Sequence, residues 1–263
     1  MNRYFRLSLL FFKIGLMRQM AYRPHFFMMV AGKVIRIALL FFFFQAIFLK
    51  VDRIGHWTYD QVLLLFATFH VVDYLMSITF YRNLASSLPG KIQTGDLDSR
   101  MLLPTNLLFF ISFETLDLAD FFSFLPFLAF LGYVFYRLGL SVSWTQAVCY
   151  AALLINALVF LYAMMLIIAT TAFWTTQAYG LARIFDNLMK IGRYPLDIFE
   201  GFARVIFIYV LPLVFIAQLP SEALLGTLSP GFMLYAFGFT GLCVAAAVAF
   251  WRVGLRNYLS ASS

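Results

Sequence analysis

The sequence predicts an all-α integral membrane protein that forms a single transmembrane domain over residues 1–263. Three observations indicate this class: 63% of the residues are hydrophobic, the mean hydropathy is +0.88, and only 12% of the residues are charged. A soluble domain carries roughly 25% charged residues. A chain with half that share cannot cover a water-facing surface, which excludes the soluble globular classes.

Six apolar segments are long enough to cross a bilayer, because a hydrocarbon core about 30 Å thick needs roughly 20 apolar residues per helix. Lys33 and Arg36 interrupt the first segment, and their long side chains can extend to the interface. An earlier start near Phe26 stays open for the first segment, and one near Asn106 for the third. The predicted spans are Ile35–Leu49, Gln61–Tyr81, Leu118–Tyr136, Thr145–Phe173, Phe202–Leu219 and Gly231–Arg252.

The 19 basic residues predict the orientation of these six spans. Sixteen fall on the side of the N-terminal segment, including Arg183, Lys190, Arg193 and Arg204. The opposite side receives only three, Lys50, Arg53 and Arg137. Because cytoplasmic loops carry the excess of Lys and Arg, both termini are predicted to be cytoplasmic. The net charge of +7 then reflects topology and requires no nucleic acid.

Residues 1–24 are predicted to form a helix that lies in the membrane interface. Arg3, Arg6 and Lys13 fall on one side of this helix. Lys13 also breaks the apolar stretch that a signal peptide would need. A short basic anchor without a mechanical role is the alternative.

A polar insert, Gly90–Asn106, lies in the predicted cytoplasmic segment 82–106 between spans two and three. It carries the signals of a short helix: an N-cap, two acids in the first turn, a base near the end and a closing proline, at Thr94, Asp96, Asp98, Arg100 and Pro104. Leu97 and Met101 share one face. A helix of two turns is not stable alone, so it must lie against a protein surface, either a partner or the chain's own spans two and three.

The same residues resemble a known family signature. The run Thr94–Asp98 followed by Leu102-Leu103-Pro104 is similar to the G-x-L-D-x-x-L-x-x-P motif of ABC-2 type transporter permeases, in the subgroup of six-span permeases that work beside a separate ATPase. Met101 stands where leucine is usual in the motif. The positions that match are Gly95, Leu97, Asp98 and Pro104.

A second stretch, residues 193–226, resembles the same subgroup. It contains a Tyr-Pro pair, an aromatic residue, a basic residue, a mid-span proline, a second proline and a Leu-Gly turn, at Tyr194-Pro195, Phe199, Arg204, Pro212, Pro220 and Leu225-Gly226. Phe173-Trp174 at the end of span four also fits. The resemblance covers most of the chain from about Gln61 onward.

The resemblance implies a permease subunit that forms a substrate pathway with a second permease subunit, identical or related, above two ATP-binding cassette ATPases. ATP-driven closure of the ATPases would move the N-terminal helix and the coupling residues, which are Gly95, Asp96, Leu97, Asp98, Arg100 and Pro104. No P-loop motif occurs in the sequence, so ATP and Mg²⁺ are expected on the partner and no cofactor on this chain. Export and a bacterial inner membrane are likewise implied by the family.

Three acids, Glu114, Asp117 and Asp120, follow the polar insert at spacings of three residues. If span three began at Asn106, Asp120 would lie about 20 Å deep, which is costly for a charge. The favoured interpretation places 106–115 along the interface and starts the span near Leu118. The carboxylates would then face water or bases such as Arg183 or Arg204. A cytoplasmic gate or a vestibule for a polar head group is the alternative.

Polar residues also occur inside predicted spans. His70, Asp73 and Ser77 are placed on one face of span two, where ionisable residues are functional candidates by default. A pathway or subunit-interface site and a His–Asp pair that joins helices are equally favoured. Asn156 in span four is interpreted as a contact between helices. Between spans five and six, 220–230 fits either a segment folded back into the outer leaflet or a tight loop.

Two other classes of protein compete with the permease. A membrane-embedded enzyme would need a nucleophile–base or metal constellation, and no such motif occurs in the sequence. Cys149 and Cys243, far apart in apolar runs, suggest neither a disulfide nor a metal site. A secondary transporter or channel often shows internal repeats or paired broken helices. The sequence does not identify the substrate: a lipid, polysaccharide, peptide or toxic amphiphile would each suit a pathway rich in phenylalanine.

Overall fold

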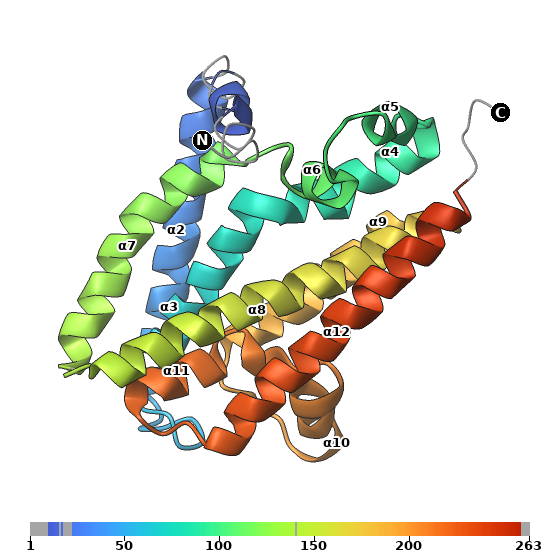
Figure 1. Cartoon of the computed structure of the whole chain (residues 1–263). Helices are drawn as coiled ribbons and strands as arrows, with labels where there is room; N and C mark the ends of the chain where they lie inside the picture. The colour runs from blue at the N-terminus through green and yellow to red at the C-terminus, as the bar shows by residue number, and fades with distance from the viewer. Residues whose placement is uncertain (1–9, 16, 18–22, 140, 259–263) are drawn as a thin grey trace.

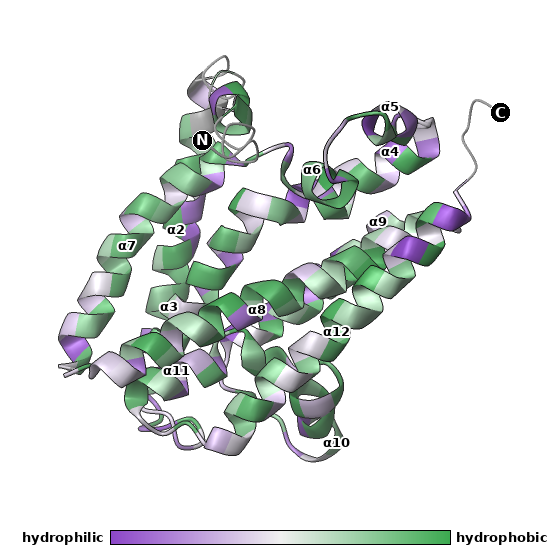
Figure 2. Cartoon of the chain, in the orientation of Figure 1, coloured by the Kyte–Doolittle hydropathy of each residue, from purple (hydrophilic) through white to green (hydrophobic). Residues whose placement is uncertain are grey.

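The computed structural model describes residues 10–15, 17, 23–139 and 141–258, and this part of the chain is helical without strands (Figure 1). Five helices are long and apolar enough to cross a membrane. They are α2 (Arg23–Phe48), α3 (Tyr59–Met76), α7 (Leu118–Leu138), α8 (Trp144–Thr170) and α12 (Pro230–Arg256). They correspond to five of the six predicted spans, and α2 has the earlier start that the sequence left open. Green, apolar residues cover most of their length in Figure 2.

The predicted fifth span, Phe202–Leu219, is wrong as a continuous helix. The segment breaks into α10 (Gly201–Val205), a π-helical turn (Ile206–Val210), a 3-10 turn (Leu213–Phe215) and α11 (Gln218–Leu225). The break lies at Leu211 and Pro212. A residue before proline is sterically pushed out of the α conformation, and Leu211 has φ −119° and ψ 79°. The apolar composition of this segment therefore does not produce a sixth long helix.

A polar helix, α9 (Ala178–Met189), with the 3-10 turn η4 (Lys190–Arg193), carries the chain back along the bundle instead. α9 begins beside the π-helical turn Asn83–Ser87, which follows α3. At the far end, Tyr194 contacts Phe44 near the end of α2, with ring centroids 5.8 Å apart. The start of α2 and the end of α12 consequently lie at one end of the molecule (Figure 1).

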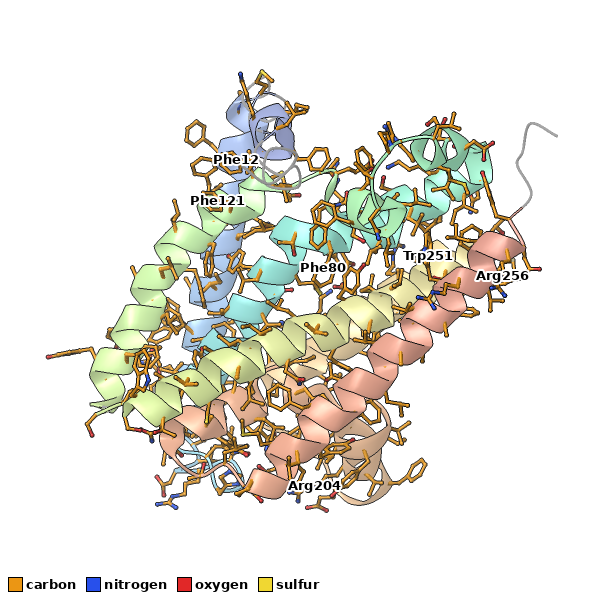
Figure 3. All side chains as sticks on the ribbon, in the orientation of Figure 1. Phe12, Phe80, Phe121, Arg204, Trp251 and Arg256 are labelled. Atoms are coloured by element: carbon orange, nitrogen blue, oxygen red, sulfur yellow. The ribbon has the colours of Figure 1, made fainter. Side chains whose placement is uncertain are left out.

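We call this the α5 end, because it also carries α4 (Leu88–Thr94), α5 (Leu97–Met101) and α6 (Leu107–Phe113). The other end, with the loop 49–58, α10 and α11, is the α10 end. Arg204 lies at the α10 end and Arg256 at the α5 end (Figure 3). The prediction that Arg204 shares a side with the chain termini is therefore wrong. Arg204 therefore belongs with Lys50, Arg53 and Arg137 on the side predicted to carry few basic residues.

Helix α3 forms the centre of the fold, since 72% of the residues in its most apolar stretch are buried. It packs against α7 and α8, and α8 packs along α12. The last contact requires a glycine at Gly254, where a Cβ atom would lie 2.5 Å from the Phe173 ring. By contrast, only 11% and 17% of the residues in the most apolar stretches of α2 and α12 are buried. These two helices leave most of their surface to lipid or to a partner.

Beyond α3 the chain continues through two π-helical turns, Ser77–Tyr81 and Asn83–Ser87, into α4. The buried Asn83 side chain fixes this region, because its Nδ2 donates to the carbonyl oxygens of Ser112 and Thr115 at 2.9 and 2.8 Å. Most of the predicted interfacial helix 1–24 lies outside the described residues. Of its described part, Phe11 contacts Phe110 and Phe12 contacts Phe121, the latter pair labelled in Figure 3.

Candidate functional site: a braced α5 and a polar seam

The polar insert forms two short helices rather than one. Thr94, predicted as the N-cap, is the last residue of α4, and Asp96 occupies the N-cap position of α5. Gly95 separates the helices in the left-handed conformation at φ 78°, which a residue with a Cβ atom adopts only at a cost. The Thr94 hydroxyl donates to the Asp96 carboxylate at 2.9 Å. Glycine is thus needed in the motif because the chain turns there.

The apolar residues of α5 divide between the interior and the surface. Leu97 is completely buried, whereas Met101 is 47% exposed and Leu102 is 86% exposed. Burial and the nearby Asp98 raise the pKa of the Tyr258 hydroxyl, so Tyr258, two residues after α12, lies beside α5. Pro104 follows the end of α5 by three residues. Leu97 therefore holds α5 in place, and Met101 and Leu102 form the apolar surface that a partner could contact.

Glu114 connects α5 to the body of the protein. Its carboxylate forms ion pairs with Lys91 of α4 and with Arg100 of α5, the latter at 3.8 Å, and accepts a hydrogen bond from Ser87 at 3.4 Å. Arg100 also lies over the Phe110 ring of α6, 5.5 Å from its centroid. Burial and the nearby Arg100 lower the pKa of the Lys91 ammonium to about 8. A displacement of α5 would be transmitted through these contacts to α4 and α6.

The other two acids have different partners, so the three do not form one site. Asp117 is the N-cap of α7, with its carboxylate accepting from the backbone N–H of Ala119 at 3.1 Å, and it lies 3.6 Å from Arg82. Asp120, 8% exposed, pairs with Lys33 of α2. The predicted partners Arg183 and Arg204 are wrong. The break before α7 agrees with the interpretation that starts span three near Leu118.

His70 and Asp73 do not form the pair that the sequence suggested. His70 is buried in the contact between α3 and α7, where its Nδ1 lies 3.1 Å from the Phe66 carbonyl and its ring stacks on Phe127. Asp73 is half-buried and is influenced instead by the charges of Arg36 and Asp186. Residues three apart are offset by about 60° around a helix, which is enough to send these side chains to different neighbours.

Asp73 belongs to a polar seam between α2, α3 and α9. The turn η4, which carries Lys190 and Arg193, packs against α3, and α3 packs against α2. Helix α9, which carries Arg183 and Asp186, packs against the π-helical turn that follows Tyr81. Lys190 donates to Asp186 at 2.6 Å. We define the polar seam as Arg36, Asp73, Tyr81, Arg183, Asp186, Lys190 and Arg193. Charges at membrane depth are costly in lipid and mark pathways or interfaces.

In this seam only Asp73 was predicted from the sequence as a pathway or subunit-interface residue, whereas Arg183 was predicted as a partner of the three acids. The signal for the rest is the pattern of α9, in which Arg183, Asp186 and Lys190 alternate at helical spacing with three buried apolar residues, Ala182, Phe185 and Met189. This is the pattern of an amphipathic helix. A search for uniformly apolar spans misses α9, because the segment as a whole is too polar.

At the α10 end, Asp197 joins the loop 49–58 to the segment before α10. Its carboxylate accepts from the Trp57 indole at 3.0 Å and from Arg204 at 2.6 Å, and lies 3.2 Å from His56. Gly55 turns the loop at φ 59°, and a Cβ atom there would lie 2.7 Å from the Cβ of Asp197. These contacts hold the loop 49–58 against the segment before α10.

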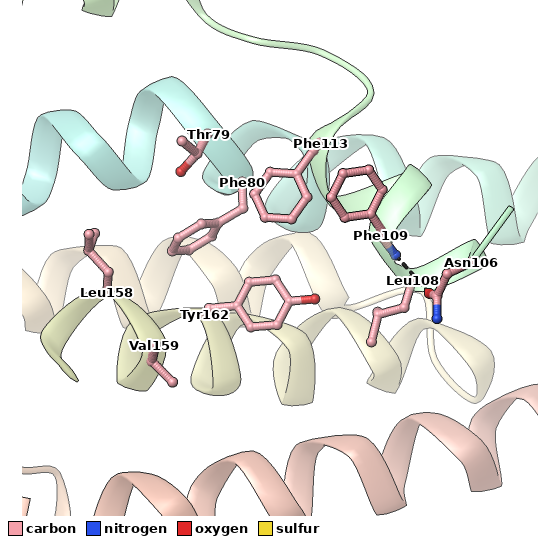
Figure 4. A pocket seen from close by; sticks show the side chains of 9 residues that line it. All are labelled: Thr79, Phe80, Asn106, Leu108, Phe109, Phe113, Leu158, Val159 and Tyr162. Atoms are coloured by element: carbon pink, nitrogen blue, oxygen red, sulfur yellow. Dashed lines mark hydrogen bonds between the residues drawn. The ribbon is translucent and has the colours of Figure 1, made fainter. Parts of the chain in front are cut away.

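An apolar pocket of about 500 Å³ opens between the end of α3, α6 and α8 (Figure 4). The rings of Phe80, Phe113 and Tyr162 face one another across it, and the Tyr162 hydroxyl is 2.9 Å from that of Ser112. Elsewhere in α8, the predicted helix contact through Asn156 is not seen, because its buried Nδ2 has no hydrogen-bond partner among the described residues. Within the same residues, no group of three or more His, Cys, Asp or Glu side chains is placed to hold a metal ion.

Comparison with known proteins agrees with this architecture. The family described as ABC-2 family transporter protein matches residues 34–262. The match includes the first span, which the sequence motifs did not reach, as well as α5 and the polar seam. No curated protein and no solved structure matches the chain. The chain belongs to the ABC-2 transporter family and is a multi-pass membrane subunit of that kind.

Proposed function

We propose that this protein is the permease subunit of an ATP-binding cassette exporter. It forms the substrate pathway with a second permease subunit, identical or related, in a bacterial inner membrane. A separate ATPase binds and hydrolyses ATP with Mg²⁺ and docks on α5. The family match carries this proposal, since it covers the whole region that contains α5 and the spans.

The arrangement of α5 supports the docking surface. Met101 and Leu102 are exposed at the end of a helix that is itself anchored by the buried Leu97. Exposed apolar residues on an otherwise braced element are typical of a contact site for another protein. The ion pairs of Glu114 with Lys91 and Arg100 would transmit a displacement of α5 to α4 and α6. Packed helices move as bodies rather than deform smoothly.

The second permease subunit has surface available on α2, because this helix is largely unburied in the monomer. Whether the partner is an identical chain is tested by purifying two differently tagged copies from one membrane.

The test of the docking surface is affinity purification from native membranes in a mild detergent, with wild type and with Leu102→Asp. An ATP-binding cassette protein should co-purify with wild type. The variant should recover at least tenfold less of that protein, because a charge placed in an apolar contact costs more than 1.4 kcal/mol of binding free energy. Leu97→Asp is unsuitable because Leu97 is buried and the change would unfold α5.

The matched control is Ile198→Asp, which places the same charge at an apolar residue 49% exposed at the α10 end. It should leave the ATPase bound. Recovery of the chain without any ATPase, in a detergent that preserves other transporter complexes, would contradict the proposal and favour a gradient-driven secondary transporter. Equal loss in both variants would contradict the placement on α5.

A further inference from the structure

We propose that the polar seam binds the anionic head group of an amphiphilic substrate. This inference rests on the proposed transport function and names its substrate class. The seam contains four cationic side chains, Arg36, Arg183, Lys190 and Arg193, against two carboxylates, Asp73 and Asp186.

The cations outnumber the carboxylates after the internal pairing is taken into account. Lys190 is paired with Asp186 at 2.6 Å, and Asp73 of α3 can balance the charge of Arg36 on the neighbouring α2. Arg183 and Arg193 are left as the excess. Arg193 is half-buried, and its Nε is buried without a hydrogen-bond partner among the described residues. A buried guanidinium nitrogen without an acceptor is costly, and an anionic ligand would supply that acceptor.

These cations are spread along the passage rather than gathered at its mouth. Arg183 to Arg193 spans ten residues of α9 and η4, a rise of about 15 Å. Arg183 lies in α9, which packs against the π-helical turn Asn83–Ser87, and Arg193 lies in η4, which packs against α3. Guanidinium groups bind phosphate and carboxylate oxygens in bidentate geometry. Successive sites of this kind suit an anionic group that moves along the seam.

The seam also offers apolar surface beside its charges, which points to an amphiphile rather than a small ion. On α2, Leu39 and Phe43 follow Arg36 by three and seven residues and so share its face. They are 64% and 48% exposed. On α9, Tyr179 lies one turn before Arg183 and is 41% exposed. A head group on the arginines would therefore leave its acyl or aryl part in contact with these side chains.

The test measures binding of fluorescent phosphatidylglycerol to the purified full-length protein in an uncharged detergent, by fluorescence anisotropy. The same tail on zwitterionic phosphatidylcholine tests the charge, and glycerol phosphate as a competitor tests the need for a tail. Phosphatidylglycerol should bind at least tenfold more tightly than phosphatidylcholine, with little competition from glycerol phosphate. Equal binding of the two lipids overturns the proposal, and full competition by glycerol phosphate overturns the amphiphile in favour of a free phosphate.

The double variant Arg183→Gln/Arg193→Gln should weaken phosphatidylglycerol binding about tenfold or more, the loss expected for charge-assisted hydrogen bonds. The matched control Arg252→Gln/Arg256→Gln removes the same charge from exposed residues of α12 and should retain binding. Arg193→Lys should retain most of the preference and shows that the site is folded. A preference lost only in the α12 control places the lipid outside the seam and overturns the proposal.

This experiment and the purification experiment fail independently. Loss of the ATPase contact through Leu102 says nothing of the seam, and the lipid measurement uses no ATPase. If the ATPase co-purifies and the lipid preference is absent, the substrate class is wrong and the transport function stands. If the lipid preference depends on the seam and no ATPase is found, the seam is a binding site in a protein of another mechanism.

Discussion

Substitution of Glu114 by Gln tests whether the Glu114 ion pairs hold α5 to the protein. Lys91 and Glu114 are both largely buried, with 13% and 10% of their side chains exposed. The variant keeps the shape of residue 114 but leaves the Lys91 ammonium buried without its counter-ion. Removing one partner of a buried ion pair typically costs about 3–5 kcal/mol of unfolding free energy. We expect a loss in this range at pH 7.

The loss should shrink at alkaline pH, because Lys91 can then lose its proton. Its pKa is lowered to about 8 in the fold, against 10.5 for an unperturbed lysine. Between these values the unfolded chain binds more protons than the folded one, so stability rises with pH. With the wild-type pKa this rise is about 2 kcal/mol from pH 8 to pH 9.5. In the variant the ammonium has lost Glu114, which favours its charged form, so its folded pKa is lower still and stability rises more than in wild type.

The assay is equilibrium unfolding in detergent at pH 7 and pH 9.5, followed by tryptophan fluorescence. Glu200→Gln, an exposed acid at the α10 end, serves as the control and should change stability little at either pH. A Glu114→Gln variant with the same deficit at both pH values, or with a deficit below about 1 kcal/mol, would refute the reasoning, since the pair would then behave as a solvated surface contact.

Two further predictions concern stability. Gly55→Ala should cost about 2 kcal/mol or more, because its φ is 59° and the new Cβ would lie 2.7 Å from Asp197, whereas Gly139→Ala, at φ 56° with nothing within 4 Å, should cost only the backbone strain; equal thermal shifts for the two variants would show that the Asp197 contact is unimportant. Asn83→Ala should cost about 3 kcal/mol in the same unfolding assay, because Asn83 is completely buried and the two N–H groups of its amide donate to the carbonyl oxygens of Ser112 and Thr115. The exposed Asn187→Ala is the control, and similar costs for both would contradict this role.

Composition and local pattern determined much about this protein. A bilayer selects helices of about 20 apolar residues, so four spans were predictable to within a few residues from hydropathy, whereas the first begins twelve residues before the predicted Ile35, at Arg23. The turn at Gly95 was likewise predictable, because this glycine has a local reason: the chain adopts the left-handed conformation between α4 and α5. Local conformational preferences of this kind do not depend on distant parts of the chain.

The tertiary structure decided which residues meet, and there the predictions failed. Glu114, Asp117 and Asp120 found Lys91, Arg82 and Lys33 as partners, because helix packing sets those pairings across long separations in sequence. Leu97 and Leu102 are indistinguishable by hydropathy, yet one is completely buried and the other 86% exposed.

The fifth passage shows the same limit most clearly. Phe202–Leu219 is apolar enough to be predicted as a span, but Pro212 breaks it. The chain instead runs from the α5 end toward the α10 end through the amphipathic helix α9. A charged helix is stable at that position because α9 packs on α8 and its Asp186 pairs with Lys190. Hydropathy averages over both faces of a helix, whereas the packing of each face separately determines where the helix lies.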